Sequence, residues 1–206
     1  MDNSARFQCA VSAARPRGQR LIEAYSPKLG RRVQCFGEAV YRQWIRLEAD
    51  PSVELFCERP AFLQLANERR LADFWVRQGA SELFLILGDP CPQSTVELDD
   101  IALPVQYVTP AELAAARIWV ANWERMLPVM TASRGLVSPS LQQALLKLIS
   151  KPVPLARIEQ ECAVGDPTAV RAALFGLLHQ GALQAPLLKT EILSYSTCFE
   201  PLGYAP

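Results

Sequence analysis

The sequence contains a single histidine, His179, and its six cysteines are scattered without one C-x-x-C pair. Structural zinc sites need four closely spaced thiolates or imidazoles, so no zinc centre is expected. Isolated cysteines without a disulfide framework are typical of the reducing cytoplasm, where we expect the protein to work. Strongly apolar runs are also short. The run at residues 83–87 has the length of a buried strand, which is too short to cross a bilayer. We therefore expect a cytoplasmic protein with neither a signal peptide nor a membrane partner.

Charge is balanced overall but unevenly distributed along the chain. Residues 1–46 carry nine Arg or Lys against three acids, a net charge of +6, and the remaining residues carry −6. Such a cationic segment suits contacts with phosphate groups, which makes DNA the expected partner. The alternative, left open by charge alone, is an arm that pairs with the acidic body or only aids solubility. The candidate DNA-binding residues of this segment are Arg15, Arg17, Arg20, Lys28, Arg31 and Arg32.

The first two thirds of the chain alternate between helical and strand-like patterns. Residues 1–32 are predicted to be an irregular basic arm, followed by an α/β domain over residues 33–127 and a linker over residues 128–139. Within the domain, helical spacing covers residues 37–49 and ends at Asp50-Pro51. A second helix should begin at Pro110, capped by Thr109, and continue to about residue 126. Strands are predicted at residues 32–36, 53–57, 61–65, 71–76, 83–87 and 103–108, which together indicate a mixed-sheet α/β core.

After the linker, residues 140–206 predict three helices and a hairpin. The helices are expected at residues 140–150, 155–162 and 168–180, with Asp166-Pro167 starting the third and Gly181 ending it. Residues 182–185 and 192–195 are expected to pair as strands. This order is that of a winged helix-turn-helix, and we expect it to fold as an independent domain. Its third helix offers one certain cation, Arg171, so DNA contact and protein docking remain equally open for this domain.

Several phrases in the first half of the chain resemble one nuclease family. They include Tyr25-Ser26-Pro27, F-G-E-A-V-Y around Glu38, L-E-A-D-P-S-V from Leu47, Arg59-Pro60, and R-R-L-A-D-F-W-V around Asp73. In order and spacing they resemble the TnsA-type endonuclease subunit of heteromeric transposases. The resemblance implies a restriction-endonuclease-like core, a winged-helix second domain, and transposase or ATPase-type subunits as partners.

The same resemblance shows that part of the catalytic motif of these nucleases is missing from this sequence. Such a nuclease needs a helix glutamate, a strand aspartate and a following acid-x-Lys pair to hold Mg²⁺ and activate water. Glu38 and Asp73 match the first two positions, but the next strand ends Leu85-Ile86-Leu87, and no lysine occurs between Lys28 and Lys147. Asp89 is the remaining candidate acid. We therefore assign no catalytic residue and regard Glu38, Asp73 and Asp89 as vestigial candidates. No cofactor is expected, and Mg²⁺ would be required only if the nuclease were active.

These features favour a catalytically inactive, TnsA-like DNA-binding protein that serves as a structural or regulatory component of a transposase assembly. One alternative is an active Mg²⁺-dependent endonuclease that uses Glu38, Asp73 and a displaced acid. The other alternative is a protein-docking adaptor that makes no contact with nucleic acid.

Overall fold

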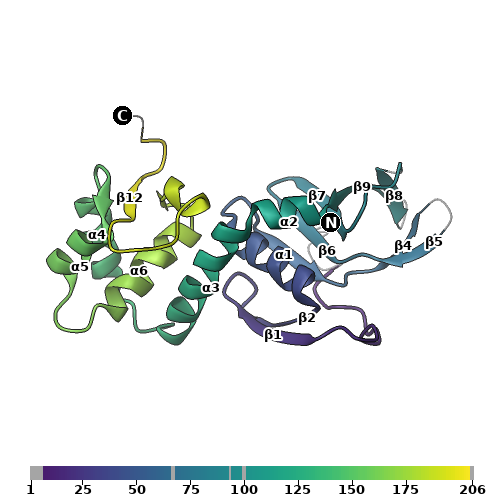
Figure 1. The fold of residues 1–206 in the computed structure, drawn as a ribbon, viewed down its shortest axis with the longest axis horizontal. Helices are drawn as coiled ribbons and strands as arrows, with labels where there is room; N and C mark the ends of the chain where they lie inside the picture. Colours follow the sequence, from purple (N-terminus) through teal and green to yellow (C-terminus); the bar gives the residue numbers. More distant parts are fainter. Residues whose placement is uncertain (1–6, 66–67, 93, 99–100, 205–206) are drawn as a thin grey trace. The chain divides into compact units, whose positions relative to one another are not determined.

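The computed structural model describes residues 7–65, 68–92, 94–98 and 101–204 as a mixed α/β protein (Figure 1). The chain divides into two compact units, residues 1–115 and residues 116–206. The division lies before the linker predicted at residues 128–139, because helix α3 (Arg117–Ala132) continues into that segment. No helix among the described residues is long and apolar enough to span a bilayer.

A five-stranded mixed sheet forms the centre of the first unit. Its order is β3 (Leu55–Glu58), β6 (Phe74–Gln78), β7 (Ser81–Leu87), β9 (Ile101–Val108) and β8 (Thr95–Leu98). All neighbours are antiparallel except β7 and β9, which are parallel. The sequence predicts four of these strands with shifted ends, whereas β8 is not predicted.

The two faces of this sheet are covered differently. One face carries the main apolar cluster, in which Phe7 packs against Trp75 and Phe84. The other face lies under helix α1 (Glu38–Ala49), which crosses the sheet in Figure 1. This helix agrees with the predicted one and gives way to extended backbone at Asp50, as expected of a residue before proline. The inner strands β6 and β7 carry three consecutive buried residues each, as expected of strands covered on both faces.

Within the predicted irregular arm, residues 7–32 pack on the first unit and include one strand and the start of a second. Phe7 is buried in the core, and Val11 donates its N–H to the carbonyl of Arg59. Strands β1 (Leu21–Ser26) and β2 (Arg31–Phe36) then form an antiparallel hairpin beside α1. This segment is therefore attached to the first unit at several points, although residues 7–20 lie outside helices and strands.

Two smaller elements complete the first unit. Strands β4 (Phe62–Leu65) and β5 (Glu68–Leu71) form a separate antiparallel pair. Helix α2 (Pro110–Ala115) begins with a reciprocal cap: Thr109 donates its N–H to Glu112, and Glu112 donates its N–H to the Thr109 hydroxyl. The cap is as expected, but the helix ends at Ala115 and α3 begins at Arg117.

The second unit is built around helix α6 (Thr168–His179). It packs against α3, α4 (Pro139–Leu148) and α5 (Leu155–Cys162), and Ala172 to Phe175 are all buried. A helix that is apolar on most sides is a core helix. Helix α3 therefore belongs to the same compact unit as residues 140–206, so this unit begins earlier than the domain expected from the sequence.

The second unit also contains a sheet of three short strands, and one polar side chain, that of Asn122, binds the segment between β11 and β12. The strand order is β10 (Val153–Pro154), β12 (Cys198–Pro201) and β11 (Leu183–Gln184), all antiparallel. The strand expected at residues 192–195 is absent, and Pro186–Lys189 forms a 3-10 turn, η2. Leu193 instead donates its N–H to Oδ1 of buried Asn122, 2.7 Å away. The N–H of Leu193 therefore bonds to a side chain of α3 and not to a neighbouring strand, as it would in the expected hairpin.

Candidate functional site

Lys28, a predicted DNA ligand, faces the protein interior. Its Nζ donates to the carbonyls of Leu47 and Val53, each at 2.8 Å, and to that of Asp50. The carbonyls at the C-terminal end of a helix lack partners within the helix, so this amine caps α1. Burial lowers the pKa of Lys28 to about 8, although Glu48 and Asp50 oppose the shift. Lys28 therefore fastens the β1–β2 turn to α1 and is unsuited to a phosphate contact.

Arg31 is also engaged inside the first unit. Its two terminal nitrogens each lie 2.7 Å from a carboxylate oxygen of Glu58, whose side chain is only 4% exposed. This is the bidentate geometry in which guanidinium and carboxylate bind most strongly. The hydrogen bonds to Glu58 raise the pKa of Arg31. Arg31 therefore neutralises a buried acid, and both of its terminal nitrogens are already engaged in this conformation.

The four other predicted DNA ligands of the segment are available to a partner. All are exposed, and no carboxylate of the described residues forms an ion pair with any of them. Because exposed, unpaired guanidinium groups are strongly attracted to phosphate, they form the candidate nucleic-acid interface. We call this set the arginine surface; its members are Arg15, Arg17, Arg20 and Arg32.

Arg171, the single cation predicted for the third helix of the second unit, is bound to neighbouring side chains. Its Nε donates to the carboxylate of Glu159 on α5, and its guanidinium carbon lies 5.6 Å from the ring centroid of Tyr195. The hydrogen bond to Glu159 raises the pKa of Arg171. A base-reading helix must expose its side chains to the groove, whereas most of α6 is buried. The structure therefore does not present α6 as a DNA reader.

The acidic residues of the predicted nuclease site do not form a metal site. Glu38 is exposed at the start of α1 and binds Arg42 at 3.1 Å. Asp73, just before β6, accepts the N–H of Leu87 at 2.7 Å, and Asp89 is exposed after β7. Burial raises the pKa of Asp73, opposed by the Leu87 hydrogen bond and by Arg70. Across residues 7–65, 68–92, 94–98 and 101–204, no three acidic, cysteine or histidine side chains gather as metal ligands.

The residues on β7 opposite Asp73 belong to the packed sheet. Leu85 is 5% exposed, Ile86 is fully buried, and Leu85 accepts the N–H of Asp73 at 3.0 Å. Neither side chain offers an oxygen ligand or a cation, and an Asp73 oxygen already accepts a backbone N–H. Mg²⁺ prefers several oxygen ligands, so the residues present do not fit the metal that the resemblance implies.

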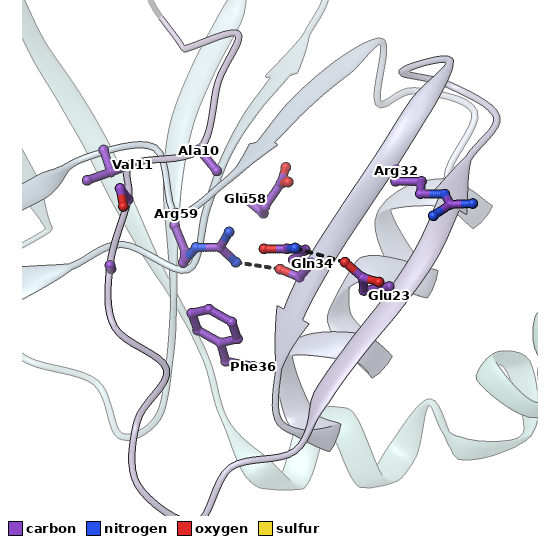
Figure 2. Close-up of a pocket in the computed structure, with 10 residues that line it drawn as sticks. Ala10, Val11, Glu23, Arg32, Gln34, Phe36, Glu58 and Arg59 are labelled. Atoms are coloured by element: carbon purple, nitrogen blue, oxygen red, sulfur yellow. Dashed lines mark hydrogen bonds between the residues drawn. The ribbon is translucent and has the colours of Figure 1, made fainter.

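A pocket that the sequence does not predict lies beside the arginine surface (Figure 2). Its volume is about 330 Å³, and its walls come from residues 10–13, from β1 and β2, and from Glu58 and Arg59. Arg59 occupies the centre, with Phe36 beneath it and Gln34 at its side. The only signal in the sequence is that Arg59-Pro60 is one of the phrases that carry the family resemblance.

No protein-family model matches this chain, and no curated protein has a detectably similar sequence. The geometry leaves two features that can act on a partner: the arginine surface and the adjoining Arg59 pocket.

Proposed function

We propose that this protein is a TnsA-like, DNA-binding accessory subunit that does not hydrolyse DNA. The observation that carries the proposal is the arginine surface, whose four guanidinium groups are exposed and unpaired among the described residues. Contacts of this kind bind the phosphate backbone without reading bases, so DNA binding should be largely independent of sequence.

The arrangement of the first unit supports a nuclease-like core that has lost its chemistry. Helix α1 precedes the antiparallel strands β3, β6 and β7, and Asp73 lies just before β6. Leu85 and Leu87 occupy the positions where a catalytic acid and lysine would be needed; Leu85 is buried and Leu87 is partly buried. A strand that keeps its packing without these polar groups serves the fold and not hydrolysis.

In the second unit, the order of elements is consistent with a winged-helix domain. The elements follow one another as α4, β10, α5, α6, β11 and β12, which is the order typical of that fold. Its basic groups are few, whereas many large apolar side chains are exposed: Leu136, Leu146, Val164, Leu187, Ile192, Tyr195, Leu202 and Tyr204. Exposed apolar groups suit protein contacts, so we assign this unit to docking on a transposase or ATPase-type subunit.

Fluorescence anisotropy with a labelled duplex of arbitrary sequence, measured at several salt concentrations, tests the proposal. Four phosphate contacts predict a slope of log affinity against log salt of about −3 to −4. The double variant R17E/R20E should lose most of the affinity. The matched control K147E/K151E changes two exposed lysines of the second unit and should bind nearly as well as the parent. A slope near zero, or equal losses in both variants, would refute DNA binding through the arginine surface.

A further inference from the structure

The backbone of Arg59 adopts an unusual conformation. Its φ is 47°, and no other non-glycine residue in the described part of the chain has a positive φ. This left-handed region is unfavourable for a side-chain-bearing residue, and such strain gathers at functional sites. Two hydrogen bonds hold the residue there: its N–H donates to the backbone carbonyl of Asp73 at 2.9 Å, and its own carbonyl accepts the N–H of Val11 at 2.8 Å.

The side chain of Arg59 is also fixed. Nη1 donates to the backbone carbonyl of Gln34, and the guanidinium carbon lies 4.4 Å from the centroid of the Phe36 ring (Figure 2). Nε is buried and has no hydrogen-bond partner among the described residues. These contacts set the position of the guanidinium before any ligand arrives, which reduces the ordering cost of binding.

The positive charge of Arg59 is not neutralised inside the pocket. Glu58 is occupied by Arg31 in a bidentate pair, and Glu23 accepts a hydrogen bond from the Gln34 amide at 2.8 Å. No carboxylate of the described residues forms an ion pair with Arg59. One Nη1 hydrogen and both Nη2 hydrogens therefore remain for a ligand. Their fork geometry matches two oxygens of a phosphate group.

We propose that the Arg59 pocket is a phosphate-binding site in which the guanidinium of Arg59 holds two phosphate oxygens. This inference deepens the proposed function, because the wall formed by residues 10–13 leads directly into Arg15 and Arg17 of the arginine surface. A DNA strand that follows these cations would place one backbone phosphate in the pocket. A free phosphate compound presents the same oxygens, so the two sources must be separated by experiment.

The test compares Arg59→Gln with Arg69→Gln in the full chain. Arg69 is a matched control because its guanidinium lies 4.8 Å from the Phe62 ring, outside the pocket. Arg59→Gln should weaken duplex binding at least about tenfold and reduce the salt slope by about one, whereas Arg69→Gln should weaken it by less than about threefold. Arg59→Gly provides a second variant, since glycine accepts the positive φ without strain. It should fold like the parent and lose the same affinity.

A second arm measures thermal stability with inorganic phosphate against chloride at matched ionic strength. Stabilisation of the parent and of Arg69→Gln, but not of the Arg59 variants, supports the site even if DNA binding fails, and then identifies the source as a free phosphate compound. If the parent binds DNA but Arg59→Gln and Arg69→Gln bind equally well, the DNA backbone is refuted as the source of the phosphate in the pocket, while the proposed function stands. Absence of any Arg59-dependent effect in both arms also overturns the inference.

Discussion

Replacing Asp73 tests whether its carboxylate stabilises the fold, as its hydrogen bond to Leu87 indicates, or serves as a metal ligand. Its Oδ2 accepts the Leu87 N–H at 2.7 Å, so Asp73→Ala leaves a partly buried donor without an acceptor. Such a loss costs about 2 kcal/mol, which lowers the Tm of a domain of this size by about 8 °C. Asp73→Asn keeps an oxygen acceptor at the same place and should be at least as stable as the parent at neutral pH.

The pH dependence of the same variants gives an independent check. Burial raises the folded-state pKa of Asp73 above the unfolded value, so the folded state binds more protons in that window. The contribution of Asp73 is therefore present at low pH and is lost as the pH rises through the folded-state pKa. Asp73→Asn abolishes this titration, so its stability relative to the parent should increase from acidic to neutral pH.

Amide hydrogen exchange at Leu87 provides the local measurement. Protection of this amide should fall in Asp73→Ala and be retained in Asp73→Asn. The reasoning is refuted if Leu87 keeps full protection in Asp73→Ala, or if Asp73→Asn loses as much protection as Asp73→Ala. Asp50→Ala serves as a control, because the Asp50 carboxylate binds the exposed Ser52 and not β7.

The remaining predictions concern three other features. Purified protein should show no nicking of plasmid DNA with Mg²⁺ or Mn²⁺; cleavage that disappears in Asp73→Ala would contradict this. Because burial lowers the pKa of Lys28 to about 8, the unfolded chain binds more protons above that pH. Stability measured by urea unfolding should therefore rise with pH between about 8 and 10, and Lys28→Met should lack that rise. Asn122→Ala removes three hydrogen bonds to residues 188, 191 and 193, and should destabilise the second unit by about 3 kcal/mol in calorimetry. An unchanged transition would show that these bonds contribute little.

Local signals predicted several elements correctly. Helix α1 follows from apolar spacing and Asp50-Pro51, and the cap of α2 follows from Thr109-Pro110. Asp166 accepts the N–H of Thr168 at 3.0 Å, as its place before α6 suggests. Each of these features depends on residues close in sequence, so patterns within one segment contain the necessary information.

Features that depend on distant partners were predicted poorly. Pro128 suggests a linker, yet it is exposed within α3, where burial of Trp123 and Met126 maintains the helix. Ile192 and Leu193 have the composition of a strand, but Asn122 takes the Leu193 N–H. Lys28 counts as a cation in the sequence, and only the folded chain directs it onto α1. The Arg59 pocket was missed because its walls come together from separate parts of the chain.

The segment from residue 12 to residue 20 is held at both ends, since Val11 bonds to Arg59 and the Arg20 carbonyl accepts the N–H of Gly37. A free tail that becomes ordered on binding loses about 1–2 kcal/mol of conformational entropy per residue. Here folding has already restricted much of that freedom. Association with DNA should therefore proceed with a small entropy loss from the chain. The affinity should instead depend on how firmly Phe7 and Gly37 keep the two ends in place.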